Sequence, residues 1–256
     1  MNTGLLLHTL LGLLLLLIPA GALYVLERKK LQSFVVAVSR MVTQLLVLCL
    51  IVWGLIKVDN TWLSLAWLLV MSGISAFIVL KRCKLDIRKL MLPTSAGLFM
   101  GVFLIGLWLL GLVLPVRIFD PRWFVPVMAL LLGHATSMMI RGLSTYVSAL
   151  HTDQQQYEFL RGNGLTHLKA LLPFFRRSLL AILSPTIANL TTLGLTAMPL
   201  LLCGLFLGGM TPVNAFLAML HMTIGCIAVS IVALAITLFL ADKALFGKRG
   251  SGPVSR

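Results

Sequence analysis

Polar side chains that could contact a solute are few in this sequence, and three of them form a stripe. Thr186, Asn189 and Thr192 follow one another at intervals of three residues, so on a helix they point to similar sides. Hydroxyl and amide groups in such a stripe can replace water around a passing solute, or they can hydrogen-bond a neighbouring helix. Both roles remain open. We take these residues, and Met198 on a different side of the same stretch, as candidates for a translocation pathway.

A histidine and an arginine in the preceding apolar stretch are further pathway candidates. His134 and Ser137 lie one helical turn apart, as in a serine–histidine dyad. No third orienting residue accompanies them, so we favour a polar pair that packs helices. Arg141 would be costly inside a membrane unless its side chain reaches the headgroups or lines a cavity. We favour the first of these, in which the helix that carries Arg141 projects into the cytosol.

Acidic residues lie outside the apolar stretches. The chain has seven: Glu27, Asp59, Asp86, Asp120, Asp153, Glu158 and Asp242. Proton-coupled carriers usually need a carboxylate within the membrane, and intramembrane aspartyl proteases need two, so the sequence disfavours both classes. The Gly-Asn-Gly at 162–164 lacks the lysine and hydroxyl of a nucleotide-binding phosphate loop, so we expect no ATP hydrolysis on this chain. Met, Cys and His residues are numerous in the last two stretches, but their spacing favours packing over a metal site.

The composition indicates which elements position these side chains. The 256 residues are 59% hydrophobic and only 11% charged, where a soluble domain has about 25% charged residues. Lipid is therefore the expected solvent for most of the chain. We predict an all-α polytopic membrane protein that forms one permease domain over residues 1–256. Its seven expected spans are Leu5–Leu26, Phe34–Ile56, Trp62–Leu80, Leu92–Val116, Trp123–Leu150, Leu179–Gly208 and Ala215–Leu240.

The positions of Lys and Arg predict the orientation of these spans. Basic residues cluster after the first, third, fifth and seventh stretches, whereas the other side keeps only Lys57, Arg117 and Arg122. Because cytoplasmic loops carry the excess of basic residues, we predict an outer N-terminus and an inner C-terminus, in a bacterial cytoplasmic membrane. The basic residues after the first stretch also argue against a cleaved signal peptide. The net charge of +14 lies in short loops, so nucleic acid is not an expected partner, and the four cysteines indicate no disulfide framework.

Two pairs of glycines have the spacing of a close contact between membrane helices. They are Gly97 with Gly101 and Gly204 with Gly208. Small residues at this spacing let two backbones approach, although a membrane chain rich in glycine contains some such pairs by chance.

The polar segment at about 152–178 separates two of the predicted spans and is the expected site of a partner. It holds a glutamate six residues before a glycine, Glu158 and Gly164. A membrane protein has little reason to keep such a loop in water unless something docks on it, and Gly164 permits a tight turn.

A family resemblance supports that interpretation. The segments DQQQYEFLRGNGLTHLKALL and SPTIANLTTLGLTAMPLLLCGLFLGGMTPVNAF resemble the FetB/YbbM family of ABC-transporter permeases. The resemblance implies a separate ATPase subunit that binds the ATP, a homodimer of permeases, no cofactor on this chain, and export of a metal ion, iron in the bacterial prototype, or of another small solute. It also implies that a short cytoplasmic helix after Glu158 couples the permease to the ATPase. The coupling residues would be Gln154, Gln155, Gln156, Glu158, Arg161, Gly164, His167 and Leu168.

The sequence departs from the family pattern at three places. Ala188 and Thr191 stand where the family usually carries an acidic residue and a lysine, His134 follows Gly133 in place of asparagine, and Leu165 to His167 replace a Thr-Pro. The missing acid would have been a natural metal contact, so substrate identity and direction of transport stay open. The alternatives from other classes are a membrane enzyme that acts on anionic lipid head groups and a scaffold that transports nothing.

Overall fold

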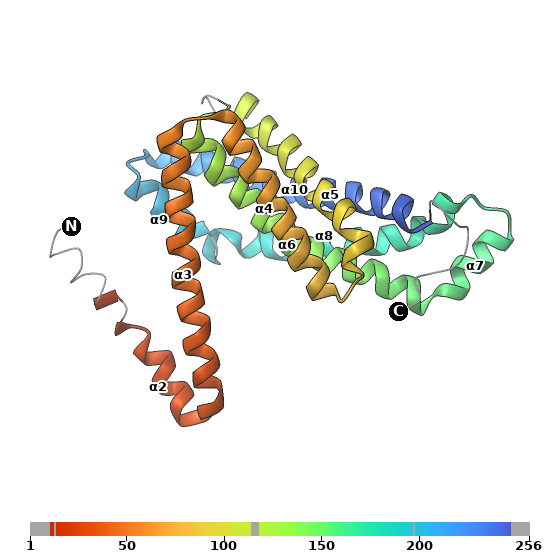
Figure 1. Ribbon diagram of the computed structural model, residues 1–256, viewed down its shortest axis with the longest axis horizontal. Helices are drawn as coiled ribbons and strands as arrows, with labels where there is room; N and C mark the ends of the chain where they lie inside the picture. The colour runs from red at the N-terminus through yellow and green to blue at the C-terminus, as the bar shows by residue number, and fades with distance from the viewer. Residues whose placement is uncertain (1–10, 13, 114–117, 197, 247–256) are drawn as a thin grey trace. The chain divides into compact units, whose positions relative to one another are not determined.

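The described part of the chain is built from helices (Figure 1). The computed structural model describes residues 11, 12, 14–113, 118–196 and 198–246; side chains are described at these positions except 192–196, 198–200 and 243–246. Within those ranges no strand is present, which agrees with the predicted all-α class. The chain divides into two compact units, residues 1–58 and 59–256, which we describe separately.

The described part of the first unit includes the helices α2 (Leu17–Leu26) and α3 (Arg28–Val58). Glu27 separates them with an extended backbone at φ −161°. Arg28 donates from Nη2 to the hydroxyl of Tyr24 at 2.9 Å, and its guanidinium carbon lies 4.5 Å from the centre of that ring. Lys30 forms an ion pair with Glu27 at 2.6 Å. Charged and aromatic groups therefore hold the corner between the two helices.

The second unit contains the remaining helices. They are α4 (Thr61–Cys83), α5 (Ile87–Trp108) with the short π-helix η1 (Leu109–Val113), α6 (Pro121–Thr152), α7 (Gln154–Gly162), α8 (His167–Thr196), α9 (Met198–Leu207) and α10 (Pro212–Phe246). Three of these helices have a side-chain N-cap. Asn60, Asp86 and Asp120 each accept a hydrogen bond from the backbone N–H two residues further on, at 2.9, 3.2 and 3.0 Å. Such caps satisfy N–H groups that a helix start leaves unpaired. Asp86 and Asp120 therefore cap helices at the ends of apolar stretches.

Six described helices are long and apolar enough to cross a membrane. They cover Arg28–Val58, Thr61–Cys83, Ile87–Val113, Pro121–Thr152, His167–Thr191 and Pro212–Asp242. Each corresponds to one of the predicted spans. The other predicted span, Leu5–Leu26, lies partly outside the described residues, and its described part includes the ten-residue helix α2. The count of seven spans and the orientation remain predictions.

The sixth predicted span, Leu179–Gly208, has different boundaries in the structure. Helix α8 already begins at His167 and continues through Pro173 and Pro185. A separate helix, α9, follows it. The early start has a physical reason, because the basic segment before Leu179 is amphipathic and buries Ala170, Phe174 and Ser178. Much of the predicted loop at 152–178 is thus helix.

Helices α5 and α10 approach each other through the first of the two glycine pairs. A Cβ atom added to Gly97 would come within 2.8 Å of the backbone nitrogen of Thr237, and one added to Gly101 within 2.8 Å of Cα of Ala233. The predicted close contact is therefore confirmed for this pair. The second pair is different, since Gly204 has open space beside it and Gly208 meets only carbonyl groups of its own helix, among the described atoms.

Helices α4, α6, α8 and α10 are joined at one level of the second unit. The thiol of Cys83 donates to the carbonyl oxygen of Ile140 at 3.5 Å. The hydroxyl of Ser178 donates to the carbonyl oxygen of Gly142 at 2.7 Å. Leu234 packs against Gly142 from α10. Beyond this level, α6 continues to its end, α8 begins, and α10 ends. These ends, together with α7, carry the candidate site (Figure 1).

Candidate functional site

A tight turn joins α7 to α8. Gly164 adopts a φ of +82°, a backbone conformation that residues with a Cβ atom rarely take. Its N–H bonds to the carbonyl of Arg161 at 3.1 Å, and the guanidinium of Arg161 donates to the carbonyl of Leu165 at 3.1 Å. The expected tight turn at Gly164 is confirmed. We call α7, the turn and the first three turns of α8 (residues 154–177) the hairpin.

A histidine at the start of α8 connects the hairpin to the end of α10. His167 Nε2 lies 2.7 Å from Oδ1 of Asp242, and His167 Nδ1 lies 2.8 Å from the hydroxyl of Tyr157 on α7. With its proton on Nε2, the neutral ring donates to Asp242 and accepts from Tyr157, so this tautomer satisfies both contacts. Three helices therefore meet at one imidazole.

The environment of Tyr157 changes its acidity. Burial raises the pKa of its hydroxyl, the negative charge of Asp242 raises the pKa further, and Arg161 opposes the rise. The hydroxyl therefore keeps its proton at neutral pH and remains available as the donor to His167.

The outer surface of α7 is open. None of its residues is buried, and Phe159 exposes 68% of its surface. Gln154 donates to the carboxylate of Glu158 at 2.8 Å along the same helix. An ion pair between Asp153 and Arg177 holds the start of α7 to α8. The hairpin is therefore attached at its base and presents a polar helix with one exposed aromatic ring.

The predicted coupling residues divide between two sides of the hairpin. Gln155, Gln156, Glu158 and Arg161 are exposed on α7, whereas His167 faces α10. Glu158 lies within the short helix, which ends four residues after it, so the expectation of a short helix that follows Glu158 was wrong in position. Among the described residues Glu158 forms no ion pair and caps no helix; it is held by Gln154.

The predicted stripe on α8 is only partly described. The hydroxyl of Thr186 donates to the carbonyl of Ile182 on its own helix at 2.6 Å, and Thr191 does the same to Ala188 at 2.7 Å. Asn189 is exposed. The side chains of Thr192 and Met198 lie outside the described ones. A pathway role for this stripe remains a prediction.

The candidates on α6 do not form a catalytic pair. The hydroxyl of Ser137 donates to the carbonyl of Gly133 at 3.2 Å, and His134 Nε2 is buried without a partner among the described atoms. Arg141 is exposed and follows Ile140, which contacts Cys83 at the end of α4. Arg141 thus lies level with the basic turn between α4 and α5, as expected if α6 projects beyond the membrane.

Two residues that contact His167, Tyr157 and Asp242, were not among the site residues predicted from the sequence. Asp242 is separated from His167 by 75 residues, so no local spacing connects them. The available signal was its position as an acid that ends the last apolar stretch, where a carboxylate needs a partner.

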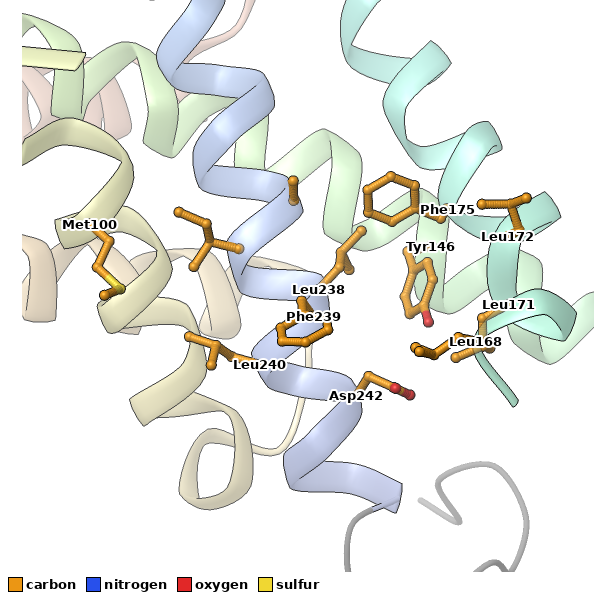
Figure 2. Close-up of a pocket in the computed structure, with 12 residues that line it drawn as sticks. Met100, Tyr146, Leu168, Leu171, Leu172, Phe175, Leu238, Phe239, Leu240 and Asp242 are labelled. Carbon is orange, nitrogen blue, oxygen red and sulfur yellow. The ribbon is translucent and has the colours of Figure 1, made fainter. Parts of the chain in front are cut away.

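An apolar pocket lies beside the link between His167 and Asp242. Its volume is about 550 Å³, and Figure 2 shows Tyr146 between the side chains of α8 and those of α10. Its lining comprises Met100, Tyr146, Leu168, Leu171, Leu172, Phe175, Ala235, Ile236, Leu238, Phe239, Leu240 and Asp242. Leu168, a predicted coupling residue, faces this pocket. A pocket of this size and composition suits an apolar ligand.

In the described ranges, no three His, Cys, Asp or Glu side chains lie close enough together to hold a metal ion. Cys49, Cys83, Cys203 and Cys226 are free thiols in this structure.

Comparison with known proteins identifies one family and several relatives. Residues 6–246 match an uncharacterised protein family, UPF0014. The UPF0014 membrane protein slr1647 of Synechocystis is 26% identical over 75% of this chain and 78% of its own length. The probable iron export permease protein FetB of Escherichia coli is 24% identical over 83% of this chain and 81% of its own. Protein ALUMINUM SENSITIVE 3 of Arabidopsis thaliana is 25% identical over 77% and 72%.

No solved structure matches the chain. The resemblance to FetB-type permeases is confirmed by the match, and the name of that relative points to transport rather than catalysis. Since the family match runs from residue 6 to residue 246 and six described helices can span a membrane, the chain is a multi-pass membrane protein that belongs to the UPF0014 family.

Proposed function

We propose that this chain is the membrane-spanning permease subunit of an ABC transporter, driven by a separate ATPase subunit. The observation that carries the proposal is the hairpin: an open polar helix, attached at its base and hydrogen-bonded through His167 to α10. The relationship to a relative named as a permease supports the transport class. ATP would bind to the partner, because the Gly-Asn-Gly at 162–164 lacks the residues that hold phosphate and magnesium.

The hairpin can transmit movement along two routes. A force on α7 reaches α8 directly through the turn at Gly164, and it reaches α10 through the contact between His167 and Asp242. Closure of the ATPases would shift both helices together and change the side to which the pathway opens. The ATPase must bind one of the two states more tightly for ATP to drive the change.

The assembly follows from the size of the chain. A seven-span chain is half of the membrane part that an ABC transporter needs, so we propose a homodimer in the bacterial cytoplasmic membrane, with the N-terminus outside and residues 1–256 acting as one domain. The substrate would be a metal ion, iron by analogy with the named permease, or another small solute. Thr186, Asn189 and Thr192 on α8 remain the proposed lining.

The test uses a matched pair of glycines. Gly162 and Gly164 both have open space beside them, but only Gly164 has a positive φ. The tagged chain should copurify with an ATP-hydrolysing subunit from cells that express both. Gly164→Val should reduce that recovery and the stimulation of ATPase activity about tenfold, since valine strains this turn, whereas Gly162→Val should change both little.

Two results would contradict the proposal. One is a wild-type chain that recovers no ATPase from membranes containing both subunits. The other is a Gly164→Val variant, monodisperse and correctly inserted, that binds and stimulates the ATPase as well as Gly162→Val does.

A further inference from the structure

The pocket beside His167 has large, exposed apolar side chains in its lining. Leu168, Leu172 and Phe239 expose 59%, 63% and 51% of their surfaces, and Met100 exposes 50%. Exposed apolar side chains on helices that can span a membrane are covered by lipid or by another molecule. The pocket itself is almost wholly apolar, with Tyr146 and Asp242 as the polar members of its lining.

Two cations lie next to this opening on α8. Lys169 and Arg176 are seven residues apart, so they lie on one side of the helix, and each is a close neighbour of Leu172 at a spacing of three or four residues. Both are exposed, and neither forms an ion pair within the described part of the chain. Arg177, the next residue, is different because it pairs with Asp153.

The carboxylate in the pocket lining does not compete for these cations. Asp242 is 11% exposed and is engaged by His167 at 2.7 Å. The surface therefore combines an apolar cavity with two unpaired positive charges at its edge, which matches a molecule with an apolar chain and an anionic head.

The position of the pocket in the second unit indicates the source of such a molecule. Basic residues crowd the turn between α4 and α5, where Lys81, Arg82 and Arg88 are exposed. The contact between Cys83 and Ile140 brings that turn level with α6 just before α6, α8 and α10 extend to the hairpin. Basic residues at the ends of spanning helices mark the headgroup region of a membrane.

We propose that the pocket binds one anionic phospholipid, with an acyl chain between α8 and α10 and the phosphate on Lys169 and Arg176. The bound lipid fills the space beside the His167–Asp242 contact and covers Leu168 and Leu172. This site is separate from the outer surface of α7, so the inference does not depend on an ATPase partner.

The test is photo-crosslinking in a bilayer. The full chain is reconstituted into phosphatidylcholine vesicles that contain phosphatidylglycerol with a photoreactive group near the end of one acyl chain. A second preparation carries the same group on phosphatidylcholine. Crosslinked residues are then mapped by mass spectrometry. We expect crosslinks to concentrate on residues 168–175 and 235–242, and to be stronger with phosphatidylglycerol.

Two sets of variants separate the head contact from the chain contact. Each basic residue near a membrane surface contributes roughly a fivefold preference for anionic lipid, so the double variant Lys169→Gln with Arg176→Gln should largely remove the preference. The matched control, Lys84→Gln with Arg88→Gln, changes two exposed cations on the α4–α5 turn and should keep it. Ala235→Phe fills the pocket and should reduce crosslinking by both lipids.

Three results would overturn the proposal. Equal crosslinking by the two lipids would contradict a preference for an anionic headgroup. Crosslinks that spread over all spanning helices would contradict a specific binding site. Loss of all crosslinks in the pocket when an ATPase subunit binds would show that a protein, not a lipid, covers this surface. The charge variants alter exposed side chains only, so they keep the test decisive if Ala235→Phe fails to fold.

Discussion

The second unit contains two regions that are held together in opposite ways. Where α5 meets α10, glycine and alanine backbones touch, and no room is left for a further carbon atom. Helix α7, by contrast, buries none of its residues, and hydrogen bonds and one ion pair between partly exposed side chains connect it to α8 and α10. Close packing among small residues is hard to displace in a membrane, whereas polar contacts near water open at lower cost. We therefore predict that α7 opens more easily than the contact between α5 and α10.

The largest effect should come from the rigid region. Gly101→Leu places a side chain against Cα of Ala233, which cannot move without shifting α10. Overpacking of this kind typically costs 1–3 kcal/mol, and contact with backbone puts this site at the upper end, about 3 kcal/mol. Unfolding in mixed detergent micelles with increasing dodecyl sulfate measures the loss.

The control for that change is another glycine on a spanning helix. Gly133 has open space beside it, so Gly133→Leu should leave the stability within about 0.5 kcal/mol of the original. If both variants lose the same stability, the tight contact between α5 and α10 is not what holds this region.

The second effect should be confined to the hairpin. His167→Ala removes two hydrogen bonds and leaves Asp242 without its partner. Hydrogen bonds to charged groups contribute roughly 1.5–3 kcal/mol, and partial exposure of His167 places the expected loss near the lower value, about 1.5 kcal/mol. Hydrogen exchange should accelerate at residues 154–166 and stay unchanged at residues 97–106.

Glu158→Gln supplies the matched control, because Glu158 is exposed and contacts Gln154 on its own helix. Its effect on exchange should be small. Acceleration that spreads into α5 after His167→Ala would mean that α7 and the bundle open as one cooperative body and not as two regions of different stability.

The same two regions differ in how well the sequence predicted them. The bundle follows from local patterns, since long apolar runs predict helices and Gly97 with Gly101 predicts a close contact. Even there, the identical spacing at Gly204 and Gly208 brings no described atom of another helix within 4 Å of an added Cβ, because spacing alone does not select the neighbour.

The hairpin shows where local patterns stop being informative. The positive φ of Gly164 was predictable from glycine in a polar turn. The start of α8 at His167 was not predictable, because the basic residues of this segment are typical of a loop. One side of the segment is buried only after α6 and α10 pack against it. The partner of His167 lies 75 residues further on, and only folding brings the two together.

The third prediction tests the electrostatics inside the hairpin. The pKa of Tyr157 is raised above the reference value of 10.0, so its protonated form is favoured by folding. That contribution is complete below pH 10 and is lost as the pH rises through the folded-state pKa. The chain has three tyrosines, so the ultraviolet titration of the native protein minus that of Tyr157→Phe isolates this one.

The difference titration should have its midpoint above pH 10. Asp242→Asn should lower the midpoint, because the negative charge that opposes ionisation is removed, and Arg161→Gln should raise it. A midpoint at or below 10 in the native protein would mean that Tyr157 is solvated, and that α7 does not pack against His167 and Asp242 in solution.

The smallest effect should come from the ion pair at the base of the hairpin. Asp153 and Arg177 expose 33% and 50% of their side chains, and exposed pairs of this kind contribute roughly 0.2–1 kcal/mol. A double-mutant cycle with Asp153→Asn and Arg177→Gln should give a coupling of about 0.5 kcal/mol that falls with added salt, since salt screens exposed charges. Arg176→Gln is the matched control, because Arg176 lies next to Arg177 but forms no ion pair in the described structure, and its coupling to Asp153→Asn should be close to zero. A coupling above about 1.5 kcal/mol, the loss expected for His167→Ala, would mean that the base of the hairpin, rather than its contact with α10, holds α7 in place.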